Sequence, residues 1–370
     1  MDEDKNQVDT GSYINDIRDP ADFRGITFSK YKKTEVRNAF IENMLKGKIE
    51  PACNWCAELI CAGHYMDVWE IILHYMGKHI HLGNPKLVIY LEMRYNMFKE
   101  IMNQSNYIND LQVRNNEKIR KLFAEIVCIL SLSAKKHSFE PIKINREEEF
   151  DMTQMTDRLK APNVQYAEPV FLKEDPKELY IAINEFAYNI SSDKPNIMQA
   201  CYWIEWIIEF DLICKKRKQV CRCFRRKEMR VENKYQKDII WIVWSTVLHY
   251  GKNRGPYIEK LLGALLNLFC IKYTTASTKK RRYLLYFCVG LIVEPVPTNV
   301  DLITDKEILN TVMGQINQVY KQIKKNEESP GTDYLFANLN KENNYEKSLK
   351  KLEMMDSIGF IPRNETRVDP

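Results

Sequence analysis

The densest group of charged side chains in the sequence spans residues 215–230. Nine of these sixteen residues are basic and one, Glu228, is acidic, so the segment carries about +8. The whole chain carries +5, so the remaining residues sum to −3. Positive charge gathered in this way predicts attraction to an acidic partner or a polyanion. We call the segment the basic run; its cations are Lys215, Lys216, Arg217, Lys218, Arg222, Arg225, Arg226, Lys227 and Arg230.

A shorter basic step occupies residues 279–282. It consists of Lys279, Lys280, Arg281 and Arg282, and we assign it to the same kind of partner-binding surface. Attraction to phosphates requires only the charges. Stacking on nucleobases would also need aromatic side chains, and Phe224 is the only one within the basic run. A solvated loop that binds nothing is the alternative interpretation of the run.

Cys53, Cys56, Cys61 and His64 have residue types and spacing that suggest a zinc site. If residues 52–62 form one continuous helix, however, the rise of about 1.5 Å per residue spreads these side chains over roughly 16 Å. One ion cannot bridge that distance. We therefore predict that these residues pack in the core and bind no metal.

Three further cysteines, Cys214, Cys221 and Cys223, lie in or beside the basic run. Neighbouring Lys and Arg side chains stabilise a thiolate and so would lower the pKa values of these thiols. We predict thiols at the protein surface. A zinc ion that clasps the loop is the alternative.

Glu205 and Glu209 are the carboxylates best placed for acid–base or metal chemistry. They stand four residues apart within an apolar helical segment, where a buried carboxylate needs a partner. We predict that each meets a Lys or Arg from a neighbouring helix, with a nuclease-like metal pair as the alternative. Glu70 and His74 also show helical spacing, but the chain holds no H-E-x-x-H pattern. We predict no catalytic residues, no cofactor and no metal.

Two helical segments must hold the basic run. Segments 196–214 and 238–250 are apolar, and each carries two tryptophans three residues apart, which places each pair close to one helical face. We predict that both helices pack in the core and that the run joins them as an exposed connection. The tryptophans predicted to be buried are Trp203, Trp206, Trp241 and Trp244.

Few features of the sequence favour sheet. Gly (13) and Pro (14) are scarce among 370 residues, and period-two alternation of apolar residues is nearly absent. Such a composition favours helix. We predict an all-α fold of two packed helical bundles or layers, with extended arms at both ends.

Changes in composition divide the chain into five predicted parts. An extended or disordered arm (1–25) precedes an N-terminal helical domain (26–135). A linker or wrapping loop (136–175), which contains three prolines, leads into a C-terminal helical domain (176–328) that includes the basic run. A polar tail (329–370) with one short helix follows.

Local signals predict where several helices begin or end. A capping residue followed by proline predicts helix starts at Asn84-Pro85 and Asp175-Pro176, and Pro256 predicts another. A capping box at residues 304–307 predicts one more start. Gly47 is predicted to end the first helix.

The cysteine content and the N-terminus indicate a reducing compartment. The chain has ten cysteines, and its first residues are acidic and lack the apolar core of a secretory signal, so we predict free thiols. The most apolar stretch, 197–213, carries Glu205, Glu209 and Asp211, each costly in a bilayer. We predict no transmembrane segment and a soluble protein.

Two groups of segments have unusual residue strings. The first comprises KIEPACNWCAELICAGH (48–64), VWEII (68–72) and IHLGNPKL (80–87); the second comprises ACYWIEWIIEF (200–210) and WIVW (241–244). Together they resemble a family of helical proteins of nucleocytoplasmic large DNA viruses, in the algal and giant-virus branches. The resemblance implies a viral protein made in the host cytoplasm or a virus factory, and we expect to find it in the virion.

Two function hypotheses follow. The first is a non-enzymatic structural virion protein, a minor capsid or internal scaffold component, that binds other capsid or virion proteins through the basic run. Viral DNA, bound without sequence specificity, would be a further partner. The second is a nucleic-acid-binding accessory factor for viral replication or late transcription, although no helix-turn-helix, RRM or zinc-finger pattern is recognisable. No small-molecule substrate is recognised.

Overall fold

The described part of the chain is built from helices. The computed structural model describes residues 10–104, 110–146, 150, 156–219 and 221–328. These residues contain helices and one isolated bridge between Ile26 and Lys32, but no strand. The predicted all-α class is confirmed. The polar tail with its predicted short helix, and the first nine residues of the predicted arm, lie outside the described residues.

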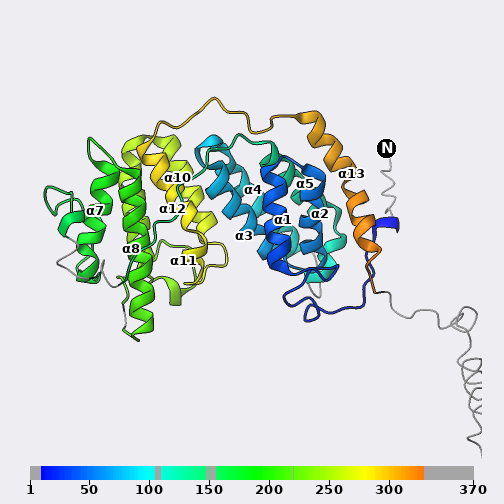
Figure 1. Cartoon of the computed structure of the whole chain (residues 1–370), viewed down its shortest axis with the longest axis horizontal. Coiled ribbons are helices and arrows are strands. Elements are labelled where there is room, and N and C mark those ends of the chain that lie inside the picture. Colours follow the sequence, from blue (N-terminus) through cyan, green and yellow to red (C-terminus); the bar gives the residue numbers. More distant parts are fainter. Residues whose placement is uncertain (1–9, 105–109, 147–149, 151–155, 220, 329–370) are drawn as a thin grey trace, which may run out of the picture. The chain divides into compact units, whose positions relative to one another are not determined.

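The first helices of the chain pack together: α1 (Lys33–Leu45), α2 (Ile49–Cys61), α3 (Tyr65–Tyr75), α4 (Lys86–Gln104) and α5 (Glu117–Leu132) (Figure 1). α2 contacts α1, α3 and α5, and α4 contacts α5. Gly47 follows the end of α1 with a φ of 67°, a region that favours glycine, as predicted. Asn116 caps α5, because its side chain accepts hydrogen bonds from the N–H groups of Lys118 and Ile119.

A second group of helices surrounds the tryptophan-rich segments: α7 (Tyr180–Ser191), α8 (Ile197–Lys216), α9 (Ile240–Gly251), α10 (Pro256–Phe269), α11 (Ser277–Lys280) and α12 (Arg282–Val293). Both α7 and α12 contact α8 and α9. Pro256 opens α10 as predicted. The four predicted tryptophans, Trp203, Trp206, Trp241 and Trp244, are 0–4% exposed, which confirms their place in the core.

The last described helix, α13 (Lys306–Lys324), packs against the first helices of the chain. It contacts α2 and α5, beside which it lies in Figure 1. The guanidinium of Arg120 stacks 4.0 Å from the ring centre of Tyr320, which is buried. Asp305 caps α13 by accepting a hydrogen bond from the N–H of Ile308, so the cap lies one residue after Thr304, where the predicted capping box places it.

Of the described residues, 10–14 and 18–326 belong to one compact unit, which holds α1 to α13. Within it, α4 contacts α10. Residues 15–17 and 327–328 belong to a second unit, in which the N–H of Ile17 donates to the carbonyl of Glu328 at 3.0 Å.

Part of the predicted N-terminal arm is anchored on the core. Ile14 and Phe23 are buried. The N–H of Ile14 donates to Oδ1 of Asn115 at 2.9 Å, and Nδ2 of Asn115 donates back to the carbonyl of Ile14 at 2.8 Å. Residues 10–14 and 18–25 are therefore held in place, since buried apolar side chains that sequence periodicity does not reveal fix this irregular segment.

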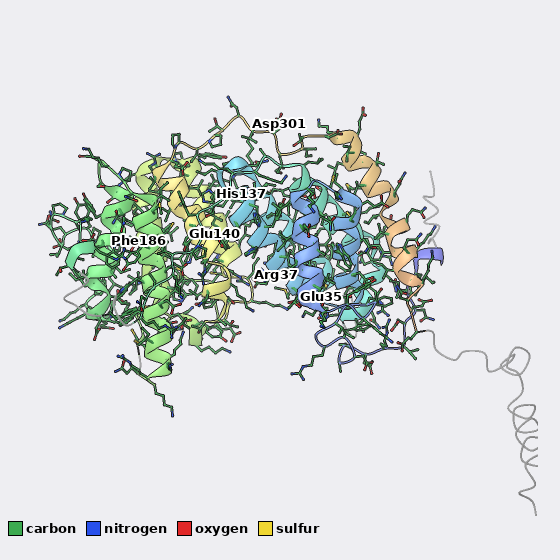
Figure 2. All side chains as sticks on the ribbon, viewed as in Figure 1. Glu35, Arg37, His137, Glu140, Phe186 and Asp301 are labelled. Atoms are coloured by element: carbon green, nitrogen blue, oxygen red, sulfur yellow. The ribbon has the colours of Figure 1, made fainter. Side chains whose placement is uncertain are left out.

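Residues 134–146, which we call the strap, wrap over the π-helical turn η2 (Met76–Ile80). The N–H of Ser138 donates to the carbonyl of Lys78 at 2.8 Å, and Nζ of Lys78 lies 2.9 Å from Oε1 of Glu140. Figure 2 labels His137 and Glu140 on the strap. His137 meets His79 of η2 with their Nδ1 atoms 3.1 Å apart. The strap is thus tied to η2 by backbone and side-chain contacts.

Among the described residues, no helix combines the length and the apolar character needed to cross a membrane.

Candidate anion-binding sites

The basic run continues from the end of α8 and reaches α9 through an irregular connection. Most of its cations are exposed: Lys215, Lys216, Arg217, Lys218, Arg222, Lys227 and Arg230. Val220 lies outside the described residues. Lys215 pairs with Asp211 one turn earlier on α8. Lys216, Arg217 and Lys218 form no ion pair with any residue that the structure describes, so their charge is available to a partner.

Arg226 is buried, contrary to the prediction of an exposed connection. Its side chain is 4% exposed, and its Nη2 lies 2.7 Å from Oδ2 of Asp175, whose side chain is fully buried. Nη2 also lies 3.3 Å from the carbonyl oxygen of Val170, and Nε lies 3.3 Å from Oγ of Ser245. Asp175 was predicted to cap a helix at Pro176. Its Oδ1 instead accepts a hydrogen bond from the N–H of Phe224 at 2.7 Å, so it anchors the run.

Arg225 is also engaged within the chain. Its Nε donates to Oε1 of Gln236 at 2.6 Å, and its Nη2 donates to Oδ1 of Asn233 at 2.7 Å. The N–H of Cys223 donates to the carbonyl of Lys237 at 3.0 Å. The second half of the run is therefore fixed alongside residues 233–237, although it has no regular secondary structure.

The cysteines beside the run are less accessible than predicted. Cys214 and Cys223 are buried, and Cys221 is half-buried. Burial raises the pKa of Cys221 to about 12 and that of Cys223 to about 12, and it raises the pKa of Cys214 as well. The prediction of surface thiols with lowered pKa values is wrong, because loss of solvent around a thiolate outweighs the attraction of nearby cations.

Two members of the basic step point inward. Arg281 is 3% exposed, pairs with Glu70 of α3 and donates from Nη1 to the carbonyl of Phe269 at 2.6 Å. Nη1 of Arg282 lies 2.9 Å from Oε2 of Glu205 on α8. These two arginines tie the start of α12 to other helices, whereas Lys279 and Lys280 remain exposed.

Glu205 and Glu209 meet cations, as predicted. Besides the pair with Arg282, Oε1 of Glu205 accepts a hydrogen bond from the hydroxyl of Tyr286 at 2.7 Å. Burial raises the pKa of Glu205. Glu209 lies 3.0 Å from Nε of Arg146 and 3.2 Å from Nζ of Lys279. Burial acts to raise the pKa of Glu209, but these hydrogen bonds outweigh it and lower the pKa.

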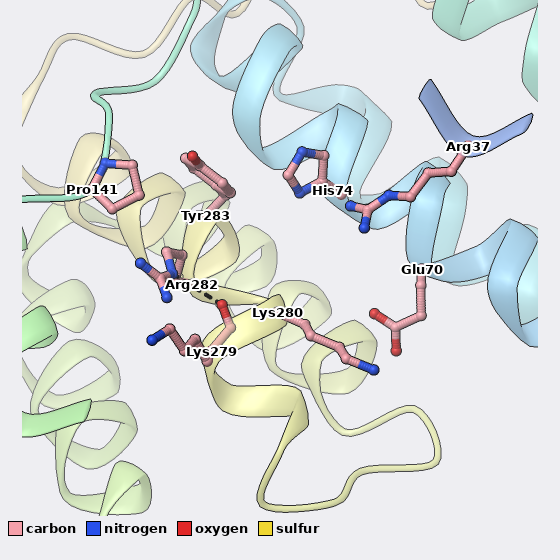
Figure 3. A pocket seen from close by; sticks show the side chains of 8 residues that line it. All are labelled: Arg37, Glu70, His74, Pro141, Lys279, Lys280, Arg282 and Tyr283. Carbon is pink, nitrogen blue, oxygen red and sulfur yellow. Dashed lines mark hydrogen bonds between the residues drawn. The ribbon is translucent and has the colours of Figure 1, made fainter. Parts of the chain in front are cut away.

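A polar pocket of about 250 Å³ lies where the basic step faces α1 and α3 (Figure 3). Its lining comes from five elements: Arg37 of α1; Glu70 and His74 of α3; Pro141 of the strap; Lys279 and Lys280 of α11; and Arg282 and Tyr283 of α12. Figure 3 shows Arg37 reaching toward His74 and Lys280 extending beneath Glu70. The pocket thus gathers four cations around a single carboxylate.

Ion pairs already neutralise part of this lining. Lys279, Arg282 and Glu70 have their partners in Glu209, Glu205 and Arg281. Arg37 and Lys280, by contrast, form no ion pair with any described residue. The pocket therefore keeps the positive charge of these two side chains.

His74 lies in the wall of the pocket in its neutral form. Burial lowers its pKa to about 4, and the nearby guanidinium of Arg37 contributes to the shift. Its ring packs edge-on against that of Tyr283, with the ring centres 5.2 Å apart. A neutral imidazole can accept or donate a hydrogen bond inside the pocket.

α2 is one continuous helix that holds Cys53, Cys56 and Cys61, as predicted, and His64 follows its end. The helix therefore spreads the three cysteines along its length. His64 directs Nε2 to the carbonyls of Phe23 and Ile26, at 3.0 and 2.7 Å. Within the described ranges, no group of three or more His, Cys, Asp or Glu side chains is arranged to hold a metal ion.

Sequence reasoning found the basic step but missed Arg37 and His74 as its neighbours. Both belong to the first helices of the chain, and no local pattern distinguishes Arg37 from other polar residues on the surface of α1. The packing of α3 and η2 against α12, and of α1 against α3, brings the two sets together.

Comparison with known proteins adds no relative. No family model, no curated protein and no solved structure matches this chain.

Proposed function

We propose that this chain is a non-enzymatic interaction protein that binds an acidic partner through the exposed part of the basic run. The observation that carries the proposal is the contrast within the run. Lys216, Arg217 and Lys218 face solvent and form no ion pair with the residues that the structure describes, whereas Arg226 is buried and holds the connection to Asp175.

An anchored loop suits binding better than a free one. Ordering a mobile segment at an interface costs free energy that is then lost to affinity. The hydrogen bonds of Arg225 and the buried pair of Arg226 fix the second half of the run before any partner arrives. The cations beside it are thereby presented from a preorganised connection.

The ion pairs of Glu205 and Glu209, the carboxylates best placed for catalysis, support a non-catalytic role for this protein. Glu205 is held by Arg282 and Tyr286, and Glu209 is held by Arg146 and Lys279. A carboxylate paired in this way serves packing between helices.

The proposed setting is the particle of a large DNA virus. The protein would be a minor capsid or internal scaffold component, assembled with other capsid or virion proteins in the host cytoplasm or virus factory. The support is the resemblance of residues 48–87 and 200–244 to helical proteins of such viruses. Mass spectrometry of purified particles tests this setting, and absence of the chain from them would contradict it.

An accessory factor that binds nucleic acid during replication or late transcription is the second candidate. Phe224, which is 41% exposed within the run, favours it, because an exposed aromatic ring beside cations can stack on a base. Affinity for duplex DNA should then fall linearly with the logarithm of salt concentration, with a slope near −0.9 per phosphate contacted.

One pair of variants tests the role of the run. The triple variant K216E/R217E/K218E should lose binding to an acidic polypeptide and to DNA, measured by fluorescence anisotropy. The control K118E/K260E/K306E makes the same change in net charge at exposed positions on three separate helices and should bind as wild type does. Equal binding by both variants would show that the run is a solvated loop.

The same assay separates the two candidates. A structural component should bind acidic protein with shallow salt dependence, or DNA without sequence preference. Tight binding to one particular duplex sequence at physiological salt would favour the accessory factor.

A further inference from the structure

The pocket between the basic step and α3 carries positive charge that no ion pair within the described residues neutralises. Its cations Lys279 and Arg282 are paired with Glu209 and Glu205, and these pairs hold helices together. Arg37 and Lys280 reach the same pocket from different elements and form no ion pair with the described residues. Two unneutralised cations beside one recess form an electrostatic trap for an anion.

We propose that this pocket binds a small phosphate-bearing anion with two or more charges, of the pyrophosphate class. The guanidinium of Arg37 offers a planar pair of N–H donors that matches two oxygens of a phosphate. Lys280 supplies a second positive charge from below Glu70 (Figure 3). A ligand with two phosphates can meet both cations at once.

The size of the pocket selects a small ligand. Pockets for drug-sized molecules range over about 300–1,000 Å³. The volume here is about 250 Å³, slightly below that range. The recess therefore suits a compact anion with its bound waters.

His74 gives the site a second recognisable property. Burial and the positive charge of Arg37 hold its pKa near 4, with smaller contributions from His79 and Lys78 in the same direction and from Glu140 in the opposite direction. An anion bound beside Arg37 would offset that repulsion and raise the pKa of His74. Binding of the anion should therefore take up protons at pH values between the pKa of His74 in the free protein, about 4, and its raised pKa in the complex.

The position of the pocket predicts that a bound anion stabilises the folded protein. Arg37 belongs to α1, His74 to α3, and Lys280 to α11, so one anion would bridge elements from both halves of the chain. A ligand that binds only the folded protein raises its melting temperature.

The test uses the full chain and sodium pyrophosphate in isothermal titration calorimetry at pH 7 and low salt. Wild type should bind with 1:1 stoichiometry. Each of R37Q and K280Q should weaken binding by about tenfold, since each removes a charge-assisted hydrogen bond. The control K118Q/K260Q, at exposed positions on other helices, should bind as wild type does.

A second measurement follows His74 directly. Its imidazole resonances in NMR should shift on addition of pyrophosphate, and its pKa should rise in the complex. Sulfate, which does not titrate in this pH range, should compete and produce the same direction of change. R37Q/K280Q should abolish the response while the circular dichroism of the protein stays unchanged.

Several results would overturn the proposal. One is that wild type shows no heat of binding with pyrophosphate. Another is that R37Q/K280Q binds pyrophosphate as tightly as wild type does. A third is that a single-stranded oligonucleotide binds more tightly through the same two residues and displaces pyrophosphate. The variant K216E/R217E/K218E should still bind pyrophosphate. Failure at the pocket is thereby distinguishable from failure of the proposed role of the basic run.

Discussion

Arg226 offers the sharpest test of how the basic run is held. Its guanidinium and the carboxylate of Asp175 are both almost fully removed from solvent and lie 2.7 Å apart. The N–H groups of Leu172 and Phe224 also donate to Asp175, at 2.9 and 2.7 Å. The variant R226M keeps an unbranched apolar chain at this position but leaves the carboxylate without its cation.

The expected loss of stability is large. Breaking a buried ion pair by removing one partner costs about 3–5 kcal/mol, because the remaining charge is buried and uncompensated. The two N–H donors to Asp175 place the cost at the lower end, about 3 kcal/mol. Against a total stability of about 5–15 kcal/mol, such a loss is easily measured.

Urea denaturation followed by circular dichroism is the assay. The variant K227M, one residue along and exposed, is the matched control and should change stability by less than about 0.5 kcal/mol. In D175N/R226M neither charge remains, so the double variant should be less destabilised than the sum of the two single variants. A loss below about 1 kcal/mol in R226M, or strict additivity in the cycle, would refute the buried pair.

Three other perturbations have defined outcomes. Y286F removes the hydroxyl that donates to buried Glu205 and should lower the free energy of unfolding by about 1–3 kcal/mol in urea; an unchanged midpoint would contradict this. Burial and His137 hold the pKa of His79 near 4, so the unfolded state binds more protons between pH 6.5 and 4, and stability decreases as the pH is lowered through this range; H79Q should reduce this dependence in urea titrations at several pH values, and His74 and His81, whose pKa values are also lowered to about 4, should account for the remainder. Cys221, with its pKa raised to about 12, should react with iodoacetamide far more slowly than a free cysteine at pH 7.5, as followed by intact mass, and labelling at the free rate would show that its burial is wrong.

Local chemistry explains which parts of the fold the sequence could predict. The start at Pro256, the end at Gly47 and the burial of Trp203 and Trp244 depend on residues within a few positions of one another. The partners of Glu205 and Glu209 were predicted by type, because a buried carboxylate requires a cation. Their identity was not predictable, since Arg282 and Lys279 lie far along the chain.

Several predictions from the sequence are wrong because contacts between residues distant in the chain outweigh the local signals. Asp175 stands before a proline and has the local signature of a helix cap, yet its carboxylate binds Arg226 and the N–H of Phe224. The cysteines of the basic run lie among cations in sequence but are buried in space, and burial decides their pKa values. The pocket at Arg37 depends on the packing of α3 against α12, which no local pattern encodes.

Positive charge in this protein therefore has two separate uses, and experiments have to keep them apart. Arg226, Arg281 and Arg282 are paired with carboxylates inside the protein, so changing them alters the fold. A variant that reverses charges across the whole run, Arg226 included, would lose the buried ion pair and with it part of the fold. A loss of binding in that variant could therefore not be attributed to the exposed cations. Reversal of Lys216 and its exposed neighbours leaves the buried pairs intact, so a loss of binding in that variant can be attributed to the surface itself.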